Sequence, residues 1–140
     1  MSIEGPILGI DPGTARIGLA RSDPLRITLQ PLPYLKKDKS FPANLLALIK
    51  KGGYTTVVVG FPVNEENRET FVCKIANEIK EIIEKDLSLP VFFQNERYST
   101  QEAEDCLREM GYKAEARKKW KDSFSAMLIL KWYCDANKKI

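Results

Sequence analysis

Three acidic residues far apart in the chain have the types and settings that a metal-dependent active site needs. Asp11 ends a short apolar run, Glu96 follows a second apolar run, and Asp122 opens an apolar helix. With no basic partner between them, three clustered carboxylates would repel one another unless a cation lay among them. Hard oxygen ligands favour Mg²⁺ or Mn²⁺, and a pair of such ions about 4 Å apart activates water in phosphodiester cleavage. We therefore predict that Asp11, Glu96 and Asp122 are the catalytic and metal-binding residues.

Each of these acids also has a simpler interpretation, which stays open. Asp11 precedes Pro12-Gly13, so it is suited to forming a turn, and Glu96 lies in a polar loop where it is readily solvated. Asp122 suits the N-cap of its helix, although capping and metal binding do not exclude each other.

The residue types that the chain lacks exclude other catalytic machinery. There is no histidine, and the cysteines Cys73, Cys106 and Cys134 form no CxxC pair. A Cys/His zinc site and a Ser-His or Cys-His pair are therefore excluded. Because each cysteine falls in a helical pattern, we expect free thiols that behave as small apolar residues.

A basic segment near the C-terminus is a candidate contact for nucleic acid. Residues 113–121 carry five basic side chains against Glu115, in a chain of net charge +3. An aromatic ring inside such a segment offers a base-stacking surface beside charges that pair with phosphate. Basic runs and loop arginines are also often simply solvated. The predicted nucleic-acid-binding residues are Arg16, Arg97, Arg117, Lys118, Lys119, Trp120 and Lys121.

The apolar patterns predict the elements that must position these side chains. We expect five strands and four helices in the order βββ-α-β-α-β-α-α, the first three strands forming an antiparallel meander. Pro31 and Pro33 suit an edge strand. Right-handed crossovers place strands four and five parallel to strand one, in a mixed sheet with helices on both faces. The expected strands are 7–11, 17–20, 27–35, 55–60 and 90–94, and the expected helices are about 42–52, 69–83, 99–110 and 122–135.

This topology brings the three acids together. Asp11 and Glu96 follow parallel strands that end at one edge of the sheet, where the chain reverses its direction of growth and ligands bind. The small Ser125 and Ala126 let the last helix approach the sheet, which moves Asp122 toward Asp11.

Length and composition predict the setting. The chain has 140 residues, of which 44% are hydrophobic and 29% are charged. We therefore expect residues 1–140 to form one globular domain. No signal sequence or apolar run of about 20 residues is present, so we expect a cytoplasmic protein without a membrane partner.

Four segments follow one another along the chain as recognisable motifs. The first is Gly9–Gly18 (GIDPGTARIG), followed by Ser22-Asp23-Pro24 and Gln30-Pro31-Leu32. The other three segments are Val58–Asn64 (VVGFPVN), Asn95–Thr100 (NERYST) and Lys121–Ala126 (KDSFSA). Together and in this order they resemble the YqgF-type family of pre-16S rRNA nucleases and Holliday-junction-resolvase-like proteins.

The resemblance implies a ribonuclease H-like three-layer α/β fold, metal-dependent hydrolysis of a nucleic-acid backbone, and cytoplasmic maturation of the 5′ end of 16S rRNA. The acids of the family carry over to Asp11, Glu96 and Asp122. Two features depart from its pattern: Asn95 stands in place of an acid, and residues 65–68 (EENR) lack glycines and add two acids.

Several functions remain open at this level. The first is cleavage of structured RNA, with the protein a monomer or a weak homodimer. The second is the same chemistry on branched DNA, for which two symmetric cuts call for a dimer. The third is an RNA-binding ribosome-biogenesis factor that does not cut. An actin-like ATPase is set aside, because such folds close two domains over the nucleotide.

Overall fold

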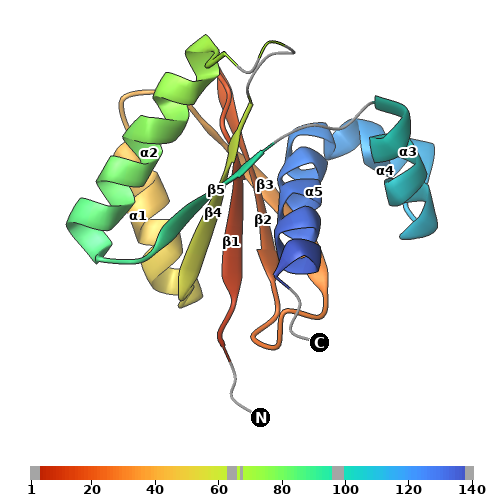
Figure 1. Ribbon diagram of the computed structural model, residues 1–140, viewed down its shortest axis with the longest axis horizontal. Helices are drawn as coiled ribbons and strands as arrows, with labels where there is room; N and C mark the ends of the chain where they lie inside the picture. Colours follow the sequence, from red (N-terminus) through yellow and green to blue (C-terminus); the bar gives the residue numbers. More distant parts are fainter. Residues whose placement is uncertain (1–3, 63–65, 67, 96–99, 138–140) are drawn as a thin grey trace.

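A mixed sheet of five strands organises the molecule, with the order β3-β2-β1-β4-β5 (Figure 1). The computed structural model describes residues 4–62, 66, 68–95 and 100–137. β1 and β3 pair antiparallel with β2, whereas β1, β4 and β5 run parallel, as predicted. The strands are β1 (Ile7–Asp11), β2 (Arg16–Ser22), β3 (Leu29–Lys36), β4 (Thr56–Phe61) and β5 (Val91–Asn95).

Helices cover both faces of this sheet, which gives three layers (Figure 1). One face carries α1 and α2, and the other carries α5 with the shorter α3 and α4 beside it. The sequence predicted four helices, whereas the described residues form five. The additional helix is α4 in the basic segment, and none of its side chains is buried. A helix without an apolar stripe has no hydrophobic period to reveal it. The helices are α1 (Phe41–Gly52), α2 (Phe71–Leu87), α3 (Thr100–Glu109), α4 (Ala114–Lys119) and α5 (Lys121–Ala136).

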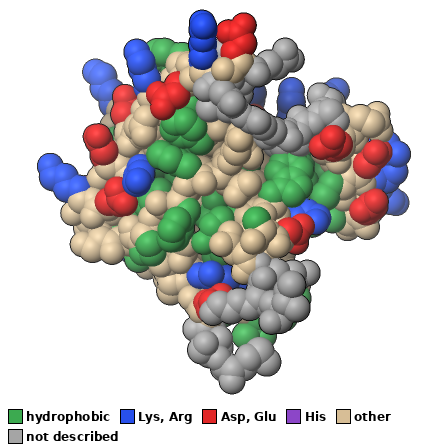
Figure 2. All heavy atoms as spheres, viewed as in Figure 1, with side chains coloured by type: hydrophobic (Ala, Val, Ile, Leu, Met, Phe, Trp, Pro, Cys, Tyr) green, Lys and Arg blue, Asp and Glu red, His purple; other side chains and the backbone are tan. Residues whose placement is uncertain are grey.

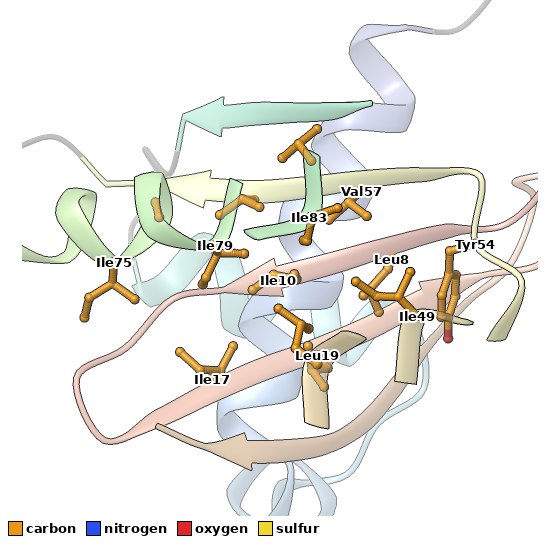
Figure 3. Packing of buried hydrophobic residues seen from close by; sticks show 14 of the residues in the cluster. Leu8, Ile10, Ile17, Leu19, Ile49, Tyr54, Val57, Ile75, Ile79 and Ile83 are labelled. Carbon is orange, nitrogen blue, oxygen red and sulfur yellow. The ribbon is translucent and has the colours of Figure 1, made fainter. Parts of the chain in front are cut away.

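The larger core lies between the sheet and the helices α1 and α2. Leu8 and Ile10 of β1 point into it beside Ile17 and Leu19 of β2, because alternate side chains of a strand face the same side (Figure 3). Their partners from the two helices include Ile49, Ile75, Ile79 and Ile83. This packing fixes β1, the strand that ends in Asp11.

The second core lies under α5, which packs closely across the middle of the sheet. A Cβ on Gly9 of β1 would overlap the Leu130 side chain and lie 3.0 Å from the Ala126 carbonyl oxygen, so the helix sits almost on the strand backbone. The first three turns of α5 are buried nearly all round, as its apolar sequence predicted. The buried residues are Ser123, Phe124, Ala126, Met127, Leu128, Ile129 and Leu130.

A β-bulge interrupts β3, the edge strand that the prolines predicted. Leu35 pairs with Ile17 and Leu32 pairs with Leu19, so Pro33 and Tyr34 together lie opposite the single residue Gly18. A bulge leaves one backbone group without a ladder partner and turns the neighbouring side chains to a new direction. It lies at the end of β2 nearest Asp11.

The three cysteines carry free thiols, as expected. Cys73 is buried, and burial raises the pKa of both the Cys106 and Cys134 thiols, so they are weakly reactive. Among the described helices, none is long and apolar enough to cross a membrane.

Candidate active site

Asp11 is the last residue of β1 and lies half-buried at the carboxyl edge of the sheet. β1 is flanked by β2 and β4. Because β1, β4 and β5 are parallel, their carboxyl ends meet at this edge, where Phe61 is in register with Asn95. The structure thus places Asp11 at the predicted switch point of the sheet.

Asp122 meets Asp11 across Gly18, a residue of β2 that pairs with Asp11. A Cβ on Gly18 would overlap the backbone carbonyl of Asp122 and lie 3.4 Å from the Asp11 Cβ. The missing side chain at Gly18 is therefore what lets the start of α5 reach β1. These two acids, 111 positions apart in the sequence, lie on either side of one glycine.

Asp122 stands inside the first turn of α5, not at its N-cap. The N-cap position belongs to Trp120, and no side chain caps this end. A carboxylate in the first turn is favoured by the partial positive charge of a helix N-terminus. The interpretation of Asp122 as the N-cap of its helix is therefore wrong.

The sequence analysis expected no basic partner among the three acids. This expectation was wrong, because Arg16 pairs with Asp122. Arg16 Nε lies 3.3 Å from Asp122 Oδ2, and the guanidinium carbon stands 5.4 Å from the centre of the Tyr34 ring. The physical reason is the short turn between β1 and β2, which returns Arg16 to the edge where Asp11 ends. Arg16 remains 56% exposed in its side chain, so it is also accessible to a phosphate.

Glu96 and Arg97 lie outside the described residues, as does Asn64. The last described residue before them is Asn95, which ends β5 beside Phe61. Glu96, the predicted third carboxylate, is the next residue in the sequence after Asn95.

The chemistry of the donor set fits a divalent metal. Asp11 and Asp122 contribute carboxylate oxygens, the ligands that Mg²⁺ and Mn²⁺ prefer. Over the described ranges no group of three His, Cys, Asp or Glu side chains is close enough to hold an ion. A third acid ligand would come from Glu96.

The basic segment divides into one structural residue and several accessible ones. Arg117 is only 17% exposed, and its Nε lies 2.7 Å from Glu104 Oε2 of the acidic helix α3. Its Nη1 donates a hydrogen bond to the Tyr112 carbonyl. Acidic and basic side chains lie side by side at this end of the molecule (Figure 2). The exposed positive charges that remain free to face a polyanion are Lys113, Lys118, Lys119 and Lys121.

Three residues near the site escaped the sequence interpretation. Tyr34 lies beside Arg16 because of the bulge, and Ser123 donates a hydrogen bond from Oγ to the Leu32 carbonyl at that bulge. Gly18 separates the two acids. Gly18 belongs to the opening motif and Ser123 to the Lys121–Ala126 segment, so their places there were usable signals, whereas nothing local in the sequence marks Tyr34.

Comparison with known proteins assigns this arrangement to a family. The model of the RuvX family, described as Holliday junction resolvase, matches residues 5–136. A protein of Lachnospira eligens named “Putative pre-16S rRNA nuclease” is 33% identical, over 95% of this chain and 99% of its own length. A Dictyoglomus turgidum protein of the same name is 37% identical, over 93% and 94%.

Solved structures of resolvases share the fold. RuvC of T. thermophilus in complex with a Holliday junction substrate superposes with a TM-score of 0.65 at 16% identity, over 96% of this chain and 97% of that one. The Fowlpox virus resolvase bound to Holliday junction DNA also gives 0.65, at 14% identity over 96% and 99%. The ribonuclease H-like fold is thereby confirmed.

Proposed function

Because the chain belongs to the RuvX family, we propose that Asp11, Glu96 and Asp122 bind divalent metal and cleave the backbone of pre-16S rRNA near its 5′ end. The protein is a nuclease, a hydrolase of phosphodiester bonds. The observation that carries the proposal is the approach of Asp11 to Asp122 around Gly18. That approach brings two carboxylate-bearing residues from different elements to one edge of the sheet, and carboxylate oxygens are the ligands that a divalent cation prefers.

Within this proposal each side chain has one task. Asp11 and Asp122 hold the ion from two elements, β1 and α5, and Glu96 adds a third carboxylate. Divalent metal bound there supplies an activated water and stabilises the leaving oxygen. Arg16 balances the charge of Asp122 at 3.3 Å and offers its exposed face to the phosphate chain. The lysines of the basic segment hold the backbone beyond the cut.

Two substrates follow from the relatives, and RNA is the first. The relatives named for pre-16S rRNA are 33% and 37% identical over nearly the full length of both chains. Branched DNA is the second candidate because the matched family model is described as a Holliday junction resolvase. We propose RNA, a monomer or weak homodimer, and a cytoplasmic location, in keeping with the free thiols.

The decisive experiment compares Asp11→Asn and Asp122→Asn with wild type on a 5′-extended 16S rRNA precursor and on a four-way DNA junction. Each substrate is incubated with Mg²⁺, with Mn²⁺ or with chelator. We expect wild type to cut the RNA only with metal, and both variants to lose cleavage while keeping wild-type circular dichroism. Asp135→Asn is the matched control, because Asp135 is an exposed carboxylate near the far end of α5, paired with Lys131.

The outcomes separate the candidates. Preferential cutting of the junction by a protein that elutes as a dimer would favour the resolvase. Tight RNA binding without metal-dependent cutting of either substrate would favour the non-catalytic factor. Two departures from the family pattern are consistent with that factor: Asn95 in place of an acid, and the acidic 65–68 segment. Cleavage at the wild-type rate by Asp11→Asn would refute the assignment of the site.

A further inference from the structure

A small pocket opens beside Asp122, one of the two described acids of the proposed metal site. Its volume is about 180 Å³. The residues that line it come from the bulged strand β3 and from the junction of α4 with α5: Pro33, Tyr34, Lys119, Trp120, Asp122 and Ser123. Asp122 therefore belongs both to the proposed metal site and to the wall of this pocket.

The bulge in β3 creates the pocket. Pro33 and Tyr34 share the space opposite Gly18, and this extra residue turns the end of β3 out of the regular pleat. Tyr34 is 43% exposed on this edge strand. The Ser123 hydroxyl binds the Leu32 carbonyl and so joins β3 to the first turn of α5.

Trp120 also lines the pocket, and its backbone is held by hydrogen bonds at both ends. It is both the C-cap of α4 and the N-cap of α5, and its N–H donates to the Ala116 carbonyl at 3.0 Å. Its carbonyl accepts from the Phe124 N–H at 2.8 Å. The side chain is partly buried against the core under α5, so its position is fixed before any ligand arrives.

Positive charge accompanies both aromatic rings. Arg16 lies 5.4 Å from the centre of the Tyr34 ring, and Lys119 Nζ lies 5.6 Å from the centre of the Trp120 ring. Two aromatic walls with a cation at each are the elements by which proteins bind single-stranded nucleic acid, since the rings stack on a base while the cations attract phosphates.

The geometry points to a binding pocket for one unpaired base of the substrate, the base next to the phosphate that is cut. This inference rests on the proposed function for the position of that phosphate. Arg16 connects the two sites, because it contacts both Tyr34 and Asp122. A base stacked on Tyr34 and Trp120 thereby sets the register of the backbone over Asp11 and Asp122.

The inference defines a substrate class. A base inside a continuous duplex is stacked and paired, and its removal from the stack costs free energy. A strand that is single, frayed or bulged at the cut pays no such cost. The enzyme should therefore cut at an unpaired nucleotide, and a perfectly paired strand covering the same position should resist.

The test places 2-aminopurine, a base whose fluorescence is quenched by stacking, at each position of a short single-stranded RNA in turn. Binding is measured with Asp11→Asn protein, which keeps the RNA uncut, alone and combined with Tyr34→Leu. We expect quenching at one position next to the cut, and Tyr34→Leu to abolish it and weaken binding roughly tenfold. An abasic nucleotide at that position should slow cleavage by wild type to a similar degree.

Phe71→Leu is the matched control. Phe71 is 65% exposed on α2, with Lys74 Nζ 5.9 Å from its ring centre, so it is an aromatic residue with a cation outside the pocket. It should change neither quenching nor cleavage. Trp120→Phe, which keeps a ring against the core, serves as a second variant with an intermediate loss if the pocket holds the base.

The outcomes distinguish this inference from the proposed function. Cleavage that tolerates an abasic nucleotide at every position, or quenching that persists in Tyr34→Leu, overturns the base pocket but leaves the nuclease intact. Quenching that depends on Tyr34, in a protein that cuts no RNA with any metal, upholds the pocket and removes the proposed activity.

Discussion

Arg16 and Asp122 form an ion pair at the carboxyl edge of the sheet, with Nε and Oδ2 3.3 Å apart. The guanidinium thus occupies part of the space around a carboxylate that we propose as a metal ligand. Both side chains are partly exposed, so the pair contributes little to stability and its main effect is on what binds at Asp122.

Arg16→Gln should strengthen the binding of Mn²⁺ and weaken the binding of RNA. Removing a positive charge beside Asp122 should lower the Kd for Mn²⁺ by about two- to fivefold. The loss of a phosphate partner should raise the Kd for RNA. Calorimetric titration of Mn²⁺ and filter binding of RNA measure the two effects.

Arg21→Gln is the control for that experiment, because Arg21 lies at the other end of β2 and contacts Gln30. It should leave the Mn²⁺ affinity unchanged. Weaker Mn²⁺ binding in Arg16→Gln would mean that Arg16 positions Asp122 and does not compete with the ion.

Gly18→Ala should strongly reduce the cleavage rate, whereas Gly9→Ala should reduce the free energy of unfolding with little effect on the cleavage rate. The Cβ of Gly18→Ala meets the Asp122 carbonyl, which is backbone and cannot move without shifting the acid itself. The Cβ of Gly9→Ala meets chiefly the flexible Leu130 side chain, away from the acids. Each overpacked position should lose about 1–3 kcal/mol of unfolding free energy. Urea unfolding and cleavage rates at saturating metal are the measurements, and equal losses of activity would contradict the special role of Gly18.

Ser123→Ala should destabilise the junction of β3 and α5. The Ser123 hydroxyl is buried and donates to the Leu32 carbonyl at the bulge, so its removal leaves that carbonyl without this partner. The expected loss of unfolding free energy is about 1–3 kcal/mol. Ser125→Ala is the neighbouring control, because the Ser125 hydroxyl makes only a long contact of 3.4 Å with Lys121 in its own helix. Equal urea midpoints for the two variants would show that the bond at the bulge contributes nothing.

The sheet order and most elements were predictable because they depend on long apolar patterns and on right-handed crossovers. The closeness of Asp11 and Asp122 followed from the same rules. The Arg16–Asp122 pair did not, because it depends on the register of a short hairpin. Tyr34 was missed because the bulge that exposes it breaks the period of two on which strand prediction relies.

The β2–β3 turn should make the protein sensitive to acid. The Asp23 carboxylate accepts hydrogen bonds from the backbone N–H groups of Thr28, Ile27 and Leu25, and the bond from Thr28 is foremost in lowering the Asp23 pKa from 3.8. Because the folded pKa lies below the unfolded one, the stabilisation is complete above pH 3.8 and is lost as the pH falls through the folded pKa.

Asp23→Asn tests this directly. It should lower the free energy of unfolding at neutral pH and flatten the fall of that free energy as the pH drops below 3.8. Urea unfolding at a series of pH values is the measurement, with Asp38→Asn as the control, because Asp38 accepts only one backbone N–H, that of Ser40, at 3.0 Å. A pH dependence as steep in Asp23→Asn as in wild type would place the acid sensitivity elsewhere.

The basic segment should separate into residues that bind RNA and one that holds the fold. Lys118 and Lys119 are exposed on α4, so Lys118→Gln and Lys119→Gln should each weaken RNA binding at low salt. Each should also reduce the slope of log Kd against log salt by about 0.7, the value for one phosphate contact on a single strand.

Arg117 is paired with Glu104 and bonded to the Tyr112 carbonyl, so Arg117→Gln should lower the urea midpoint and leave the salt slope unchanged. Lys50→Gln, on α1 across the sheet, should alter neither quantity. A salt slope that falls with Arg117 but not with the lysines would reverse the assignment, because it would mean that the Glu104 pair opens when RNA binds.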